Sequence, residues 1–244
     1  MTWVYSYILS LAVTAMIREK SNAVMNMGIS TERIFAIGDI HGCFDKLCSL
    51  MDRIAPDRLK DILIFLGDYI DRGPQSMEVV DYLLHLSEIG FKAIFLKGNH
   101  EAMLLDYLDN PDDYHRMMYM FNGGYATVES YTLRMKSGGG FLVPPAHMIF
   151  FQSLRLFYET DSHIFVHAGL LPGLPLNEQK EKDLLWIRDE FIHSSYDFGK
   201  IVVFGHTPFQ EPLILEKKIG IDTGAVYGNK LSCLELPAGR FHSV

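Results

Sequence analysis

The chain has 244 residues, of which 48% are hydrophobic, so it is long enough to bury a core and is not expected to be disordered. Its net charge of −8 argues against a general surface for nucleic acids or anionic membranes, and any phosphate chemistry would need local arginines or bound cations. The three cysteines are too few for a disulfide scaffold, so we expect free thiols and a cytoplasmic protein.

An apolar run covers residues 3–17. It is shorter than the roughly 20 residues of a membrane-spanning helix, and no basic residue precedes it as in a signal peptide. We interpret residues 1–30 as an N-terminal extension whose role the sequence does not define. A form anchored in the membrane or exported through this apolar segment is the alternative to a cytoplasmic protein.

Three similar units follow, with the sequences RIFAIGDIHG, DILIFLGDYIDRG and FKAIFLKGNHE. Each contains a nearly continuous apolar run that ends in glycine and a polar cluster, which is typical of a strand covered on both faces. Helical spacing of apolar residues between them predicts helices over residues 43–55 and 75–89, and a short helix follows at 101–108. The predicted order is therefore β-α-β-α-β.

Residues 109–160 are interrupted by glycine and proline pairs and predict an inserted, variable lobe of helices and loops. The strand pattern returns at residues 163–169, 200–206, 218–224 and 231–236. We therefore expect one α/β domain over residues 31–244 that includes this lobe.

Polar side chains stand at the ends of five consecutive predicted strands, where ligands of α/β sheets bind. These residues are Asp39, His41, Asp68, Asn99, His100, His167 and His206. Mixed nitrogen and oxygen donors suit Mn, Fe, Zn or Ni better than Ca or Mg. The donors outnumber the needs of one ion, so the pattern predicts a two-metal site with the ions about 3.5–4 Å apart.

The motifs GDIHG, GDYIDRG, GNHE, HAG and GH, in this order, resemble the PPP family of serine/threonine phosphatases, within the calcineurin-like metallophosphoesterases. The small bacterial and phage members look most similar, because FNGGY, LLWIRDEF, FGHTP and IDTGAVYGNKLSCLEL also match that group. The resemblance extends from Arg33 to Leu236. It implies a central β-sandwich of mixed sheets flanked by helices, with a helical and loop insertion.

The resemblance also implies a role for each site residue. One metal would be held by Asp39, His41 and Asp68, and the other by Asp68, Asn99, His167 and His206. His100 would be the general acid and Asp71 its orienting partner, while Arg72 and Arg188 would bind the phosphate. From the sequence alone, Arg188 would more often pair with Asp189 or Glu190 at the surface.

The implied activity is hydrolysis of phosphomonoesters by a hydroxide that two divalent metals activate, with Mn²⁺ first and Fe, Zn or Ni as alternatives. The first substrate class is phosphoserine or phosphothreonine in proteins, or a small phosphoester, and we expect no nucleic-acid partner or stable membrane association. The alternative is a symmetrical dinucleoside tetraphosphatase, or a related nucleotide or RNA-cap pyrophosphohydrolase, with the same metal core. Lys97 departs from the arginine that many family members have before GNHE.

Overall fold

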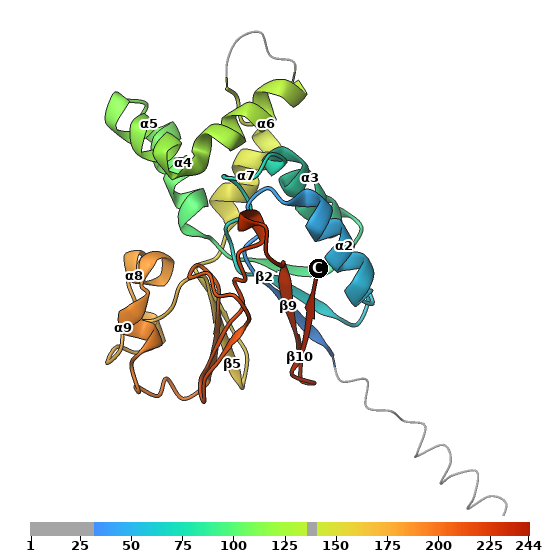
Figure 1. Cartoon of the computed structure of the whole chain (residues 1–244), viewed down its shortest axis with the longest axis vertical. Helices are drawn as coiled ribbons and strands as arrows, with labels where there is room; N and C mark the ends of the chain where they lie inside the picture. The colour runs from blue at the N-terminus through green and yellow to red at the C-terminus, as the bar shows by residue number, and fades with distance from the viewer. Residues whose placement is uncertain (1–31, 136–140) are drawn as a thin grey trace, which may run out of the picture. The chain divides into compact units, whose positions relative to one another are not determined.

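The computed structural model describes residues 32–135 and 141–244, and Arg33–Val244 form one compact unit. Two five-stranded sheets pack face to face within it, and helices cover their outer faces (Figure 1). The predicted α/β fold with a central sandwich of mixed sheets is confirmed. The apolar segment 3–17 lies outside the described residues, and within them no helix is long and apolar enough to cross a membrane.

The first sheet has the order β10-β9-β1-β2-β3, in which β1, β2 and β3 are parallel and β9 and β10 are antiparallel to their neighbours. Its strands are β1 (Ile34–Ile37), β2 (Ile62–Phe65), β3 (Lys92–Phe95), β9 (Ser232–Leu236) and β10 (Arg240–Ser243). The second sheet has the order β4-β5-β6-β8-β7, with β5, β6 and β8 parallel. Its strands are β4 (Phe157–Glu159), β5 (His163–Val166), β6 (Ile201–Phe204), β7 (Leu213–Ile214) and β8 (Lys218–Gly220).

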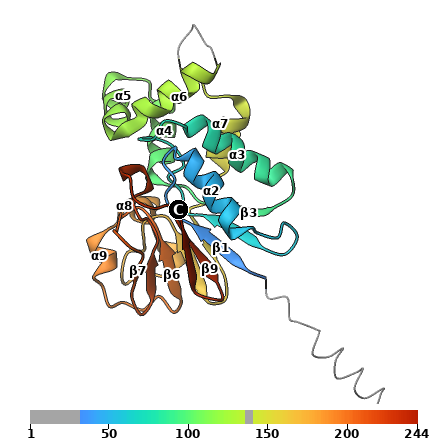
Figure 2. The same cartoon turned by 45° about the vertical axis from the view of Figure 1, so that its right-hand side comes forward.

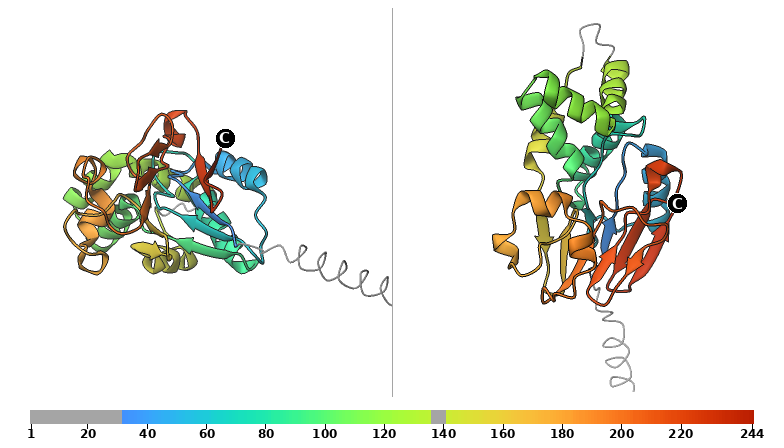
Figure 3. Two further views of the ribbon diagram at one scale, coloured as in Figure 1. Left: turned by 90° about the horizontal axis from the view of Figure 1, so that it is seen from below. Right: turned by 60° about the vertical axis from the view of Figure 1, so that its left-hand side comes forward.

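The helices lie on the two outer faces and in the inserted lobe (Figures 2 and 3). Helices α2 (Phe44–Ile54) and α3 (Ser76–Glu88) pack on the first sheet, and α8 (Glu181–Trp186) and α9 (Asp189–Ile192) pack on the second. Helix α4 (Asn99–Asp109) leads from β3 into the lobe, which contains α5 (Asp113–Tyr119), the kinked turn η1 (Met120–Gly124), α6 (Tyr125–Met135) and α7 (Pro145–Ser153). Two 3₁₀ turns, η2 (Leu176–Glu178) and η3 (Ala225–Tyr227), complete the described elements.

The seven predicted strands and the two long predicted helices are found where the sequence placed them. Two predictions were inexact. Helix α4 begins at Asn99 rather than Glu101, so that Asn99 and His100 lie in its first turn. Residues 157–159, predicted as part of the lobe, form β4 at the edge of the second sheet.

Alternate residues of each central strand face different layers, as the two-residue period of a strand requires. Phe35 and Ile37 face the helices of the first sheet, whereas Ala36 belongs to the cluster between the sheets. Phe165 of the second sheet is fully buried in that same cluster, opposite residues of the first sheet. The contact between the sheets therefore depends on small and large apolar side chains that fit together across the sandwich.

We predict that Phe165→Ala lowers the free energy of unfolding by about 3–5 kcal/mol, because it removes a buried ring and leaves a cavity between the sheets. The matched control is Leu59→Ala, since Leu59 is 74% exposed and its truncation should cost less than about 0.5 kcal/mol. Urea unfolding of both variants measures the difference. Equal costs for the two variants would contradict the packing described here.

Candidate metal centre

The predicted metal ligands converge from both sheets at the carboxyl ends of their parallel strands. Asp39 and His41 follow β1, Asp68 follows β2 and Asn99 follows β3, while His167 and His206 follow β5 and β6 of the other sheet. Each of these six residues is at most 5% exposed. The sandwich therefore gathers charged and polar groups, normally found at surfaces, into one buried cluster.

Asp68 lies at the centre of this cluster. Its Oδ2 is 3.4 Å from His41 Nε2, and its Oδ1 is 3.4 Å from His167 Nε2. Two groups of side chains have ligand atoms within 4.8 Å of one another and could each hold a metal ion: His41, Asp68 and His100, and Asp68, His167 and His206. Asp68 belongs to both groups, which is the arrangement of a bridging carboxylate.

Asn99 and Asp39 complete the predicted ligand set. The Oδ1 atom of Asn99 is 3.0 Å from His167 Nε2 and 2.9 Å from His206 Nδ1. The carboxylate of Asp39 accepts hydrogen bonds from the backbone N–H of His206, at 3.2 Å to Oδ1 and 3.0 Å to Oδ2. The two halves of the cluster, one from each sheet, are thereby in direct contact.

The histidines carry their protons in the positions that suit metal binding. Nδ1 of His41 is 2.8 Å from the carbonyl oxygen of Ile70, and Nδ1 of His167 is 2.9 Å from that of Leu66. A carbonyl only accepts, so each Nδ1 donates and each Nε2 carries the lone pair that a metal ion would use. Burial lowers the pKa of His41 to about 3, so that this imidazole is neutral at neutral pH, as a metal ligand must be.

His206 fits the same pattern. Burial lowers its pKa to about 2, and its Nε2 is a buried nitrogen for which the described residues provide no hydrogen-bond partner. Buried polar atoms without a partner are rare and require an explanation. Neutral imidazoles, a shared carboxylate and an unpartnered buried nitrogen together fit a borderline divalent cation in this cluster.

The backbone of the site is held in conformations that side chains disfavour. Positive φ angles occur at His41 (47°), Asp68 (52°), Asp71 (72°), Arg72 (67°) and His206 (63°). Among the described residues, Ala55 is the only other non-glycine residue with a positive φ. Such conformations cost roughly 1–3 kcal/mol each and persist where the surroundings enforce them, typically at functional sites.

Glu101 is a buried residue of the site to which the sequence analysis gave no role. Its carboxylate accepts hydrogen bonds from the backbone N–H groups of Asp68 (2.9 Å), Tyr69 (2.8 Å) and Gly98 (2.9 Å). Burial and the nearby Asp68 charge raise its pKa to about 8. Glu101 is the third residue of α4, a position at which a glutamate side chain can accept the backbone N–H of the residue before the helix, here Gly98. This position was the signal in the sequence. Glu101 holds the turn that carries Asp68.

Asp222 is a second buried carboxylate that the sequence analysis did not assign. It follows β8 and is therefore a further polar residue at the end of a parallel strand. It is 5% exposed, and burial raises its pKa to about 6. Its Oδ1 accepts a 2.9 Å hydrogen bond from the N–H of Gly224, which fixes the turn that leads into η3.

Asp71 and His100 form a closely hydrogen-bonded pair beside the metal ligands. His100 Nδ1 is 2.7 Å from Asp71 Oδ2, and both residues are fully buried. Burial lowers the pKa of His100, but the carboxylates of Asp68 and Asp71 outweigh burial, and the net shift is upward. Nε2 of His100 is a buried nitrogen with no partner among the described residues, and it lies 4.0 Å from Asp68 Oδ2.

The two predicted phosphate-binding arginines reach this cluster from different elements. Arg72 follows Asp71 after β2, and its Nη1 is 2.6 Å from His41 Nε2. Arg188 lies between α8 and α9, where its Nη1 donates a 3.3 Å hydrogen bond to Thr207 Oγ1, next to His206. Its charge contributes to lowering the pKa of His206. Arg188 is thus turned toward the metal cluster.

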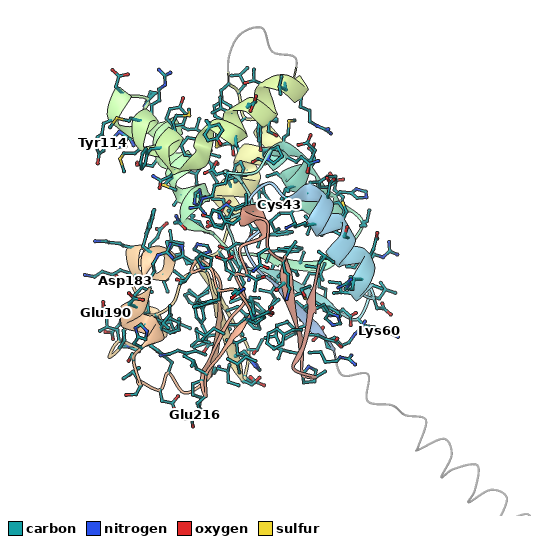
Figure 4. The ribbon with its side chains drawn as sticks, in the orientation of Figure 1. Cys43, Lys60, Tyr114, Asp183, Glu190 and Glu216 are labelled. Atoms are coloured by element: carbon teal, nitrogen blue, oxygen red, sulfur yellow. The ribbon has the colours of Figure 1, made fainter. Side chains whose placement is uncertain are left out.

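Asp183 of α8 and Glu190 of α9 lie at the outer left-hand side of the view in Figure 4. Within residues 32–135 and 141–244, Arg188 forms no ion pair with Asp189 or Glu190. Lys97, the departure from the family motif, forms an ion pair with Glu181 at the start of α8, with 3.0 Å between Nζ and Oε1. This contact connects the end of β3 to the helix that precedes Arg188.

Comparison with protein families gives the class of protein that this fold and site define. The family model described as "Calcineurin-like phosphoesterase" matches residues 32–230, most of the chain. The chain therefore belongs to the calcineurin-like phosphoesterases, a family of hydrolases. The resemblance to metal-dependent phosphatases inferred from the strand-end motifs is confirmed at this level.

Particular relatives carry two kinds of name. The serine/threonine-protein phosphatase 1 of Salmonella typhimurium is 29% identical, over 82% of this chain and 89% of the relative. The asymmetrical bis(5'-nucleosyl)-tetraphosphatase PrpE of Halalkalibacterium halodurans is 26% identical, over 85% of this chain and 92% of the relative. A solved structure assigned provisionally as a diadenosine tetraphosphatase superposes with a TM-score of 0.68 at 25% identity, covering 88% of this chain and 93% of that one.

We predict that Asp68→Asn and His100→Asn differ in metal content. Asp68→Asn removes a charge from the shared ligand and should deplete bound metal, whereas His100→Asn should retain both ions and lower kcat by about 10²–10⁴-fold, as loss of a general acid does. Elemental analysis after Mn²⁺ loading and gel filtration gives the metal content of each variant. Equal depletion in both would make His100 a ligand, as its position near His41 and Asp68 also permits.

Proposed function

We propose that the chain is a metal-dependent hydrolase of phosphoric esters whose general acid is His100. The observation that carries the proposal is the buried Asp71–His100 pair, with 2.7 Å between Oδ2 and Nδ1 and an unpartnered Nε2 beside the metal ligands. An imidazolium that is held at Nδ1 by a carboxylate can donate only from Nε2. This is the geometry that a proton donor to a leaving oxygen requires.

The other site residues bind and orient the phosphate in this proposal. Arg72 and Arg188 present guanidinium groups from two sides, and the planar fork of each donates hydrogen bonds to phosphate oxygens. Asp39, His41, Asp68, Asn99, His167 and His206 would hold two divalent cations. When bound, the cations supply Lewis acidity that neutralises the phosphate charge and activates water for attack.

A phosphorylated serine or threonine in a protein is the first candidate substrate. The Salmonella relative carries that name. The inserted lobe also exposes apolar side chains, since Phe121 is 88% exposed and Met117 is 61% exposed. Gly123, two residues after Phe121, accepts a 3.0 Å hydrogen bond from the backbone N–H of Arg72. A polypeptide whose phosphate binds Arg72 would therefore lie against this face of the lobe.

A dinucleoside tetraphosphate is the second candidate, and two exposed aromatic residues favour it. Tyr227 is 64% exposed, and its ring centroid is 5.7 Å from Cζ of Arg72. Trp186 is 42% exposed, and its ring centroid is 6.0 Å from that of His206. Aromatic side chains at this distance from the phosphate-binding groups can stack on a nucleobase, which typically contributes about 1–3 kcal/mol. Several relatives are named as asymmetrical tetraphosphatases.

We expect Mn²⁺-loaded protein to hydrolyse 4-nitrophenyl phosphate, to lose this activity with a chelator and to regain it better with Mn²⁺ than with Mg²⁺. Phosphoserine, phosphothreonine and phosphotyrosine peptides and diadenosine tetraphosphate are then compared by kcat/KM. For the dinucleotide, the products separate symmetrical cleavage to two ADP from asymmetrical cleavage to ATP and AMP. Full activity in protein that elemental analysis shows to be free of metal would refute the metal-dependent mechanism.

Two surface variants separate the candidate substrates. Tyr227→Ala should raise KM for diadenosine tetraphosphate at least about 5-fold, because about 1 kcal/mol of stacking is lost, and leave phosphopeptide hydrolysis nearly unchanged. Phe121→Ala should raise KM for phosphopeptides and leave hydrolysis of diadenosine tetraphosphate nearly unchanged if polypeptides bind along the lobe. Each variant serves as the control for the other, and 4-nitrophenyl phosphate reports the intact centre. If neither variant changes any KM, neither aromatic side chain selects the substrate.

Arg188→Ala tests the second phosphate contact. Its side chain bonds only weakly to Thr207, so we expect stability within about 1 kcal/mol of wild type and unchanged metal content. The value of kcat/KM should fall at least 10-fold, which corresponds to roughly 1.4 kcal/mol, and inhibition by inorganic phosphate should weaken. Unchanged kinetics and unchanged phosphate inhibition would leave Arg72 as the sole phosphate-binding arginine of the proposal.

A further inference from the structure

The inserted lobe contacts the proposed acid through the second oxygen of Asp71. Oδ2 of Asp71 is bonded to His100, while Oδ1 accepts hydrogen bonds from Tyr119 Oη (2.7 Å) and Thr127 Oγ1 (2.6 Å). Tyr119 ends α5 and Thr127 lies in α6, so both donors come from the lobe. All four residues are at most 1% exposed. The carboxylate is therefore held at both oxygens, with no access for water.

The backbone of Asp71 is bonded to the same residues. Its N–H donates to Thr127 Oγ1 (2.9 Å) and to Ser76 Oγ (3.1 Å), and the two hydroxyls are 3.0 Å apart. This set of bonds surrounds a residue whose φ is 72°, a conformation that needs external support. Thr127 thus fixes the main chain and the side chain of Asp71 together.

Tyr119 is itself held so that its hydroxyl has one position. Its ring stacks on Tyr107, with 5.4 Å between centroids and 17° between planes. On another side lies Gly124, where a Cβ atom would come within 2.5 Å of Tyr119 Cε1. Burial and the Asp71 charge raise the pKa of Tyr119 well above its usual value, so the phenol remains a donor. The second glycine of FNGGY provides the space that this ring occupies.

Gly123, the first glycine of FNGGY, leaves space for the side chain of Arg72 in the same way. Gly123 has a φ of 102°, which favours glycine, and a Cβ atom there would lie 2.7 Å from Arg72 Cγ. Its carbonyl oxygen accepts the backbone N–H of Arg72 at 3.0 Å. One turn of the lobe, η1 with its neighbours Tyr119 and Thr127, therefore contacts both Asp71 and Arg72.

We propose that Tyr119 and Thr127 are positioning residues that orient the Asp71 carboxylate, and through it the His100 imidazole, for proton donation to the leaving group. This inference rests on the proposed role of His100 as general acid. Rotation of the carboxylate about its Cβ–Cγ bond would move Oδ2 away from His100 Nδ1 and misalign Nε2. Two hydroxyl donors on Oδ1 prevent that rotation. A lobe whose sequence carries no catalytic motif thus takes part in the chemistry.

Leaving-group dependence tests this role. 4-Nitrophenolate departs with little help from an acid, whereas phenolate needs protonation, so misalignment of His100 should matter more for phenyl phosphate. We expect Tyr119→Phe to lower kcat for phenyl phosphate about 10-fold or more and kcat for 4-nitrophenyl phosphate less than about 3-fold, with KM little changed. Metal content should equal that of wild type. An equal loss on both substrates would overturn the inference and make the hydroxyl purely structural.

Tyr131→Phe is the matched control, because Tyr131 is also fully buried in α6 and its hydroxyl bonds to His147 Nδ1 at 2.8 Å rather than to Asp71. It should cost stability but show no leaving-group dependence. Thr127→Val and Thr127→Ser form a second pair in case Tyr119→Phe does not fold. Thr127→Val should lower kcat for phenyl phosphate more than kcat for 4-nitrophenyl phosphate. Thr127→Ser keeps the hydroxyl and should retain most of the activity on both substrates. Equal behaviour of Val and Ser would contradict the inference.

The double variant His100→Asn/Tyr119→Phe separates this inference from the proposed function. If His100 is the acid, His100→Asn alone shows strong leaving-group dependence, and adding Tyr119→Phe causes little further loss. If His100→Asn shows none, the proposed acid is wrong. If His100→Asn shows it and neither Tyr119→Phe nor Thr127→Val does, only the positioning role is wrong.

Discussion

Burial of the Asp68 carboxylate is the constraint on which the rest of the site depends. The residue is 1% exposed, and a charge removed from water in this way costs several kcal/mol unless opposite charges compensate it. The depressed pKa values of His41 and His206 make those imidazoles neutral and unable to compensate. Among the described side chains of the site, positive charge comes from Arg72 and Arg188, and the pKa of His100 is raised by the carboxylates of Asp68 and Asp71. Bound divalent cations would therefore stabilise a cluster of this composition, and we expect metal binding and folding of the strand ends to be coupled.

The sandwich architecture explains how these groups come together. Parallel strands of two different sheets end at the same edge, so ligands separated by more than 100 residues meet, such as Asn99 and His206. The turns after β1, β2 and β6 contain the residues with positive φ, and buried hydrogen bonds from Glu101 support the turn at Asp68. The apolar clusters on both sides of the sheets and between them contribute favourable free energy of folding, which offsets the cost of these disfavoured backbone conformations.

The central strands, and the meeting of the polar side chains that follow them, could be predicted because each strand is a continuous apolar run that ends in glycine and a polar residue. The two edge strands of the second sheet could not be predicted, since β4 has three residues and β7 has two, too few for a periodic pattern. The start of α4 was misplaced because Asn99 and His100 resemble loop residues and only the capping position of Glu101 indicates a helix there. The hydroxyl donors to Asp71 were missed because Tyr119 and Thr127 lie 48 and 56 residues further along the chain, and a lone Tyr or Thr carries no local signal.

One turn of the inserted lobe connects an exposed aromatic side chain to residues that contact the site. Phe121, which is exposed, lies in the same turn η1 as Gly123 and Gly124, which pack against Arg72 and Tyr119. A side chain in place of either glycine would clash with Arg72 or Tyr119 before it altered the outer surface. In the proposed function, exposed positions such as Phe121 could therefore change substrate preference alone, whereas changes at the two glycines would disturb Arg72 and the Asp71–His100 pair together.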